Sequence, residues 1–204
     1  MASAAPAIPL RFQRQELQLR ANLSKVGQVC LAKITGPQEL IATLGQLGEH
    51  QDAIGALAMM LPRRQAVWWG CLCMRLLPDL PNRPAELLAV ETAESWIQSQ
   101  SEADAERAGT AAEMCALDSA CGYVAMAAYW AGPSLAPRGQ QAVPPPPYLA
   151  GVAVRAALLL AAVEPSVEGR LTLPDFLGIG TAIMHGDLGR KAQATVRDRL
   201  AAAG

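Results

Sequence analysis

Aromatic residues are scarce in this sequence, where they make up 4% of 204 residues. Strands of sandwiches and barrels are rich in aromatic and β-branched residues, so this scarcity argues against an all-β fold. Strong charge is lacking as well, because the formal net charge is −1 and no run of like charges attracts phosphate groups locally. These two deficits predict a protein that is not built from strands and does not bind nucleic acid.

Long apolar runs are also missing. The longest, LAGVAVRAALLLAAV at residues 149–163, is shorter than the roughly 20 residues of a membrane-spanning helix and contains Arg155. The N-terminal stretch MASAAPAIPLRFQRQE has no basic segment followed by a long apolar one, as a secretory signal requires. The five cysteines are odd in number and lie mostly in apolar surroundings, which favours reduced, buried thiols. We therefore expect no membrane insertion and a cytoplasmic location.

Apolar residues, chiefly alanine and leucine, supply 51% of the sequence and favour helices. Residues 35–204 are predicted to form a single helical domain, and residues 1–34 an N-terminal arm that is either a short strand or a helix. Short helices joined by proline and glycine predict an all-α fold, either an irregular multi-helix bundle or a short α-solenoid of antiparallel helix pairs. The apolar spacing places helices at residues 38–47, 50–61, 63–77, 84–100, 102–117, 121–131, 148–163, 174–185 and 190–204.

Several residues are predicted to cap these helices. Ser101 and Thr172 each precede a helix and have an aspartate three residues later, which is an N-cap arrangement. Asp118 is expected to cap the helix of residues 121–131. Gly132, followed by proline, is expected to end that helix in the left-handed conformation.

The stretch LPRRQAVWWGCLCMR, at residues 61–75, contains most of the residues that suggest a site. Successive helical residues are rotated by about 100°, so Cys71 and Cys73 point to nearly opposite sides and cannot share one zinc ion. Neither a metal nor a cofactor is predicted. The same rotation separates Trp68 from Trp69, so if one indole fills the core, the other lies toward the rim. Packing against neighbouring helices is the ordinary interpretation of this pair, and a binding hot spot is the sharper one.

Arg63 and Arg64 lie in the first turn of the same predicted helix, where the helix dipole disfavours cations. A solvated face is the usual explanation. An ion pair with the acidic helix of residues 86–94, or with a partner's carboxylates, is the alternative.

A proline-rich strap is predicted at residues 133–147, where four consecutive prolines hold the chain stiff and extended. The sequence PPPPY at its end is expected to lie across the protein's own helices, and docking into an aromatic groove of another protein is the alternative. The residues of this motif are Pro144, Pro145, Pro146, Pro147 and Tyr148.

An enzyme with a cysteine nucleophile is the alternative from another functional class. Such a nucleophile needs a base or a helix N-terminus to stabilise its thiolate. The only histidines are His50 and His185, which are far apart in the sequence and each near a predicted helix end. The string HGDLG at residues 185–189 lacks the glycine spacing and the lysine of a phosphate-binding loop.

The order of LPRRQAVWWGCLCMR, ETAESWIQ, CGYVAMAAYWAGPSLAP and VPPPPYLAGVAVRAALLLAAV resembles an uncharacterised family of bacterial proteins, DUF6931, over roughly residues 38–186. The resemblance implies occurrence near type VI and related contractile secretion loci. It further implies a cytoplasmic accessory role, such as an adaptor or an effector chaperone, and brings no catalytic residues with it.

The leading hypothesis is a non-enzymatic, all-helical cytoplasmic protein that binds another protein, with a secretion-system component or effector as the expected partner. A cysteine-dependent enzyme using His50 or His185, and a structural homo-oligomer, are the two alternatives. The proposed contact residues are Arg63, Arg64, Trp68, Trp69, Pro144, Pro145, Pro146, Pro147 and Tyr148.

Overall fold

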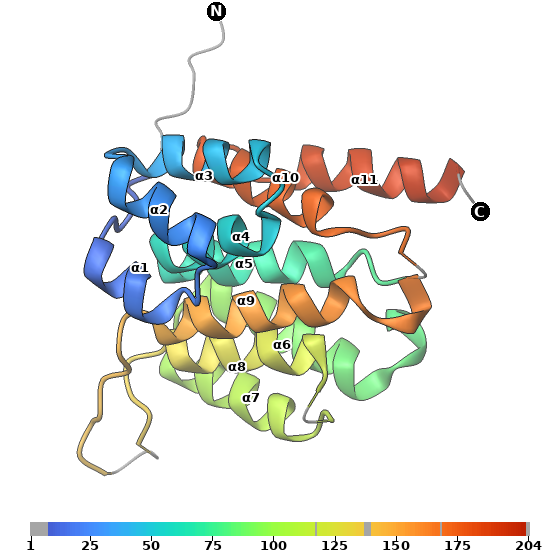
Figure 1. The fold of residues 1–204 in the computed structure, drawn as a ribbon. Coiled ribbons are helices and arrows are strands. Elements are labelled where there is room, and N and C mark those ends of the chain that lie inside the picture. The colour runs from blue at the N-terminus through green and yellow to red at the C-terminus, as the bar shows by residue number, and fades with distance from the viewer. Residues whose placement is uncertain (1–7, 117, 137–139, 168, 203–204) are drawn as a thin grey trace, which may run out of the picture.

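A computed structural model describes residues 8–116, 118–136, 140–167 and 169–202, and within these ranges the chain is all-α with no strand (Figure 1). The predicted fold class is therefore confirmed. The α-helices are α1 (Arg14–Arg20), α2 (Lys25–Lys33), α3 (Pro37–Gln46), α4 (His50–Met60), α5 (Arg63–Met74), α6 (Pro84–Ser99), α7 (Glu102–Glu113), α8 (Ala120–Ala131), α9 (Leu149–Ala162), α10 (Leu173–Met184) and α11 (Arg190–Ala202), and the short 3-10 helices are η1 (Leu80–Asn82) and η2 (Pro165–Val167).

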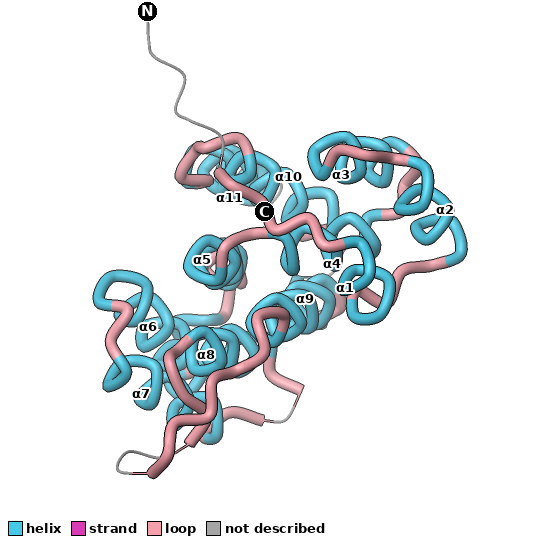
Figure 2. Tube along the Cα trace, turned by 90° about the vertical axis from the view of Figure 1, so that its left-hand side faces the viewer, coloured by secondary structure: helices cyan, strands magenta, loops and turns pink. Residues whose placement is uncertain are grey.

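The helices form three layers. Helices α4, α5 and α9 lie in the middle, with α6, α7 and α8 on one side and α3, α10 and α11 on the other (Figures 1 and 2). Helices α4 and α9 approach closely because α9 has a glycine at the contact: a Cβ on Gly151 would lie 2.5 Å from the carbonyl oxygen of Ala58. Small residues therefore set the spacing of the central layer.

The N-terminal arm is helical over α1 and α2, which settles the choice between strand and helix for the described residues 8–34. Leu17 and Leu31 belong to the same buried cluster as the central helices. The arm is also tied to α4 through Asp52, which is 4% exposed and accepts hydrogen bonds from the main-chain N–H of Ser24 at 3.0 Å and from its hydroxyl at 2.7 Å. Ser24 in turn caps α2 by accepting from the N–H of Gly27.

The helix ends confirm some cap predictions and correct others. Ser101 accepts from the N–H of Asp104, and Thr172 forms a capping box with its aspartate, both as expected. The predicted cap Asp118 is wrong: Ser119 caps α8 by accepting from the N–H three residues on. Gly132 is extended instead of left-handed, with φ −66°. A Cβ on it would lie 2.7 Å from that of Ala105, so glycine is needed there for close approach to α7.

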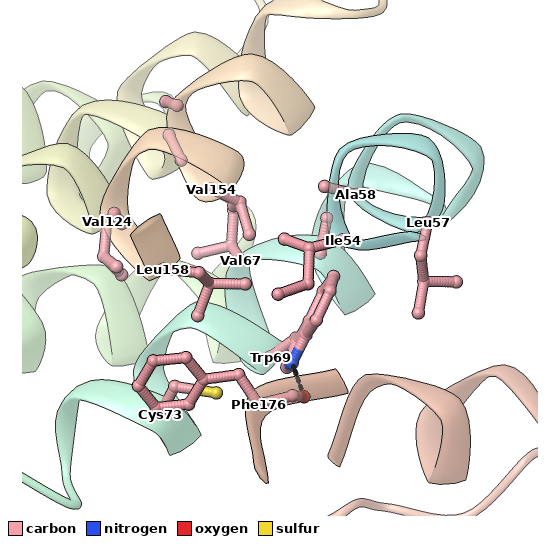
Figure 3. Packing of buried hydrophobic residues seen from close by; sticks show 14 of the residues in the cluster. Ile54, Leu57, Ala58, Val67, Trp69, Cys73, Val124, Val154, Leu158 and Phe176 are labelled. Atoms are coloured by element: carbon pink, nitrogen blue, oxygen red, sulfur yellow. Dashed lines mark hydrogen bonds between the residues drawn. The ribbon is translucent and has the colours of Figure 1, made fainter. Parts of the chain in front are cut away.

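The buried centre surrounds Trp69 of α5, whose ring lies between α4 and α10 with Ile54 and Leu57 beside it (Figure 3). Its indole N–H donates to the main-chain carbonyl of Phe176, with Nε1 and the oxygen 2.8 Å apart. The ring fits because α10 has Gly180 at the contact. None of the described helices is both long enough and apolar enough to cross a bilayer.

Candidate functional site

The two adjacent tryptophans of α5 have different surroundings, as their rotation around the helix predicts. Trp69 is 0% exposed, whereas Trp68 is partly exposed at the rim of the core. The indole N–H of Trp68 donates to the main-chain carbonyl of Leu188 at 2.8 Å, and the guanidinium of Arg190 lies 5.2 Å from the ring centre. The turn between α10 and α11 thus fixes the orientation of the Trp68 ring.

A hollow of about 430 Å³ opens beside Trp68 between α5, α6 and the turn that leads into α11. We call it the tryptophan groove. Its apolar wall includes Ile97 and Leu188, of which Leu188 is 70% exposed. Its other lining residues are Ile8, Arg64, Gln65, Glu94, Gln98, Ile183, Gly186, Asp187 and Arg190. The groove combines a partly exposed aromatic ring and an exposed aliphatic side chain with charged groups of both signs.

The two predicted arginines point to different places. Arg64 lines the tryptophan groove and donates from Nε to the main-chain carbonyl of Ile97 at 2.7 Å. Arg64 is exposed, which agrees with the solvated face that was the usual explanation, and the described residues give it no ion pair with the acidic helix of residues 86–94. Arg75 pairs with Glu94 of that helix instead, with Nη2 and Oε2 2.6 Å apart. A cation is favourable near the C-terminal end of a helix, which explains the place that Arg64 occupies.

Arg63 faces the proline strap. Its guanidinium donates to the main-chain carbonyl of Pro145 at 3.2 Å, and burial together with nearby Arg11 lowers the Arg63 pKa from its ordinary value. Pro145 is buried, and Tyr148 lies under the guanidinium of Arg20, 4.8 Å from the ring centre. These contacts place the end of the strap on the protein's own surface, which is the arrangement that the sequence favoured over docking on another protein.

The rest of the PPPPY motif is more open, since Pro144 and Pro147 are exposed and Pro146 is partly buried. The candidate residues thus separate into three groups. Trp69 belongs to the core, Arg63 and the strap belong to one contact, and Arg64 and Trp68 line the tryptophan groove. Sequence reasoning missed Leu188 and Arg190 because the HGDLG turn was interpreted only as a helix stop.

Four of the five thiols have the opposite properties to those of a nucleophile. Burial raises the pKa of Cys121 to about 12, and it raises the pKa of Cys71 and Cys73 well above the ordinary value. Cys115 is partly exposed, but burial raises its pKa too, and its sulfur contacts the main-chain carbonyl oxygens of α7 and α6. Thiols with raised pKa values stay protonated near neutral pH and react slowly. This finding weighs against the cysteine-enzyme alternative.

The histidines occupy helix ends, as the sequence suggested. His50 is the first residue of α4 and His185 is the exposed C-cap of α10. Within the described ranges, no group of three or more histidine, cysteine, aspartate or glutamate side chains is arranged to hold a metal ion.

A comparison with protein families finds a family whose sequence model covers most of the chain. The sequence model of a family of unknown function, DUF6931, matches residues 40–184. The chain belongs to DUF6931. The match runs from α3 to the end of α10, so it includes Arg64 and Trp68 and ends before Leu188 and Arg190. Comparisons with curated proteins and with solved structures return no match.

Proposed function

We propose that this DUF6931 protein is a non-enzymatic accessory that binds another protein through the tryptophan groove. The observation that carries the proposal is Trp68, which is partly exposed and yet held in one orientation by the carbonyl of Leu188 and the guanidinium of Arg190. Tryptophan and arginine are enriched where binding energy concentrates in interfaces, and a fixed ring loses little freedom when a partner covers it.

The surroundings of Trp68 support this interpretation. Leu188 presents an exposed aliphatic side chain beside the ring, while Arg64, Glu94 and Asp187 supply polar groups around them. Protein interfaces commonly combine an apolar centre that excludes water with a polar rim that fixes the orientation of the partner. We expect the partner to insert an apolar side chain between Trp68 and Leu188.

The cellular role that we propose is that of an adaptor or effector chaperone of a type VI or related contractile secretion system, acting in the cytoplasm. Its support is what the resemblance to DUF6931 implies, which is occurrence near such loci. The expected partner is a component or an effector of that system.

Site-specific photocrosslinking in the native bacterium tests the proposal. A photoreactive residue at Leu188 should capture a partner, whereas one at Leu19, which is equally exposed at 69% against 70%, should not capture the same protein. Adding Trp68→Ala should abolish the crosslink from position 188, because it removes the centre of the contact. The chain must remain folded, which circular dichroism at the working temperature checks.

Two outcomes would contradict the proposal. One is a crosslink of equal yield from positions 188 and 19. The other is a crosslink from position 188 that survives Trp68→Ala in a folded chain. Leu188→Ser is a milder variant that keeps the main-chain carbonyl bound by Trp68, and it should also weaken capture.

A further inference from the structure

A second hollow, of about 510 Å³, lies at the end of the bundle where α5, η1, the segment before α10 and the C-terminal part of α11 meet. This is the end opposite α1 and α2, on the right in Figure 1. Its floor is apolar and includes Leu80, Leu171 and Leu200. Leu80 and Leu171 are almost fully buried, while Leu200 is only partly buried. The floor therefore consists of buried leucines and of a more accessible leucine on α11.

Its charged residues all have the same sign. Arg75, Arg170 and Arg197 line the hollow, and no aspartate or glutamate among the described residues does so. In a protein whose formal net charge is −1, this concentration of cations is a local departure from the balance of the whole chain. We call the hollow the arginine groove.

Two of the three guanidiniums are available to a ligand. Arg75 is held by Glu94, whose hydrogen bond and charge raise the Arg75 pKa despite partial burial. Arg170 and Arg197 are exposed, and within the described part of the chain neither side chain has a hydrogen-bonding, ion-pairing or ring partner. Their unused donors stand on two different segments beside the apolar floor.

We propose that the arginine groove binds an acidic amphipathic peptide segment of a partner protein. Apolar side chains of the peptide would cover Leu200 and its neighbours, and its carboxylates would accept hydrogen bonds from Arg170 and Arg197. Guanidinium groups bind carboxylates in a bidentate manner, and complementary charge raises both specificity and the rate of encounter. The hollow is open to solvent, so a segment whose two ends continue outside it can lie across the floor.

This proposal goes beyond the one for the tryptophan groove and does not depend on it. No residue lines both grooves. The same assay can therefore be run on Trp68→Ala, which should leave peptide binding unchanged within about twofold.

The probe is a fluorescein-labelled synthetic peptide of about 12 residues, with leucines at helical spacing and glutamates elsewhere. The control peptide has the same sequence with glutamine in place of each glutamate. Fluorescence anisotropy on the full chain should show binding of the glutamate peptide that weakens as the ionic strength rises from about 0.05 M to about 0.3 M. The glutamine peptide should bind at least about tenfold more weakly.

Arg170→Gln and Arg197→Gln should each weaken binding about three- to tenfold, as expected for charged hydrogen bonds at a rim. Lys33→Gln removes the same charge from an exposed position on α2, at the other end of the bundle, and should change binding less than about twofold. All three positions are exposed, so folding is retained and can be verified by the thermal midpoint.

The proposal is overturned if the glutamate and glutamine peptides bind alike, or if both arginine variants bind the glutamate peptide as tightly as the unchanged chain. It is also overturned if sodium decanoate binds at these arginines while the peptide does not, which would identify a site for small apolar acids. Loss of peptide binding in Trp68→Ala alone would place the peptide in the other groove.

Discussion

The position of the Trp69 ring depends on the absence of a side chain at Gly180, and a pair of glycine substitutions in α10 can measure this dependence. A Cβ built on Gly180 would lie 2.5 and 2.6 Å from two ring atoms of Trp69 and 3.0 Å from a methyl group of Leu57. Gly178, two residues earlier in the same helix, is exposed and has no atom within 4 Å of such a Cβ. Gly178→Ala is therefore the matched control for Gly180→Ala.

Both substitutions gain the helix propensity of alanine over glycine, which is about 1 kcal/mol in an exposed helix interior. Gly178→Ala should keep this gain and raise the free energy of unfolding by about 0.5–1 kcal/mol. Gly180→Ala should lose it to steric overlap, because the indole is rigid and its N–H is bound to Phe176 on the same helix. Overpacking costs about 1–3 kcal/mol, and an unpaired buried N–H costs about 1–3 kcal/mol more if the ring moves away.

We therefore expect Gly180→Ala to be less stable than Gly178→Ala by about 2–4 kcal/mol. For a chain of this size, each kcal/mol corresponds to about 2–4 °C in the thermal midpoint. Urea unfolding followed by far-UV circular dichroism measures the difference. Adding Trp69→Phe removes Cζ2 and the N–H bond that holds the ring in place, so the loss caused by Gly180→Ala should shrink by at least about 1 kcal/mol in that background. Equal stability of the two alanine variants, or the same loss with phenylalanine at position 69, would refute the reasoning.

Three further predictions concern other parts of the fold. Arg83 pairs with three carboxylates, so Arg83→Met should cost about 1–3 kcal/mol and less in high salt. Arg107→Met removes a single pair whose arginine is exposed, and it should cost under about 0.5 kcal/mol in the same urea assay. Gly151→Ala should destabilise the chain by more than about 2 kcal/mol, because its new methyl group meets main-chain atoms of Ala58, which cannot rotate out of the way as a side chain can. An unchanged free energy of unfolding would contradict the close crossing of α4 and α9. Burial raises the pKa of Cys121 from 9.0 to about 12, so the stabilisation that its protonated thiol gives the folded chain is complete below about pH 9 and is lost as the pH rises toward 12. The difference in unfolding free energy between the unchanged chain and Cys121→Ala should therefore narrow by about 1.4 kcal/mol from about pH 8 to about pH 10. A difference that stays constant with pH would contradict this.

The helices of this protein could be predicted because their signals are local. Apolar spacing located α3, α4 and α9 within one or two residues, and the caps at Ser101 and Thr172 are side chains that bond to their own helix. Helix ends that depend on tertiary contacts were harder to predict from the sequence. The helix predicted to reach Leu77 ends at Met74, where a turn begins.

The candidate site was predictable only in part, for a reason visible in α5. Helical rotation separated Trp68 from Trp69, but α5 is buried on most of its surface, so the sequence around the pair does not say which ring faces inward. Phe176 and Gly180, more than a hundred residues away along the chain, make that choice. The partner of Arg64 was not predicted for a related reason, because it is a main-chain carbonyl and carbonyls leave no mark in the sequence.

The scarcity of aromatic residues and the frequency of glycine and alanine have one structural consequence in common. Glycines at the helix contacts, such as Gly70 against Val124 and Gly109 against Tyr129, bring backbones close together and let a few large rings fill the remaining space. A chain built this way has few aromatic rings to place on its surface. Trp68 is one of these rings, and it is partly exposed and fixed in orientation. This position supports the proposal that a partner binds beside it.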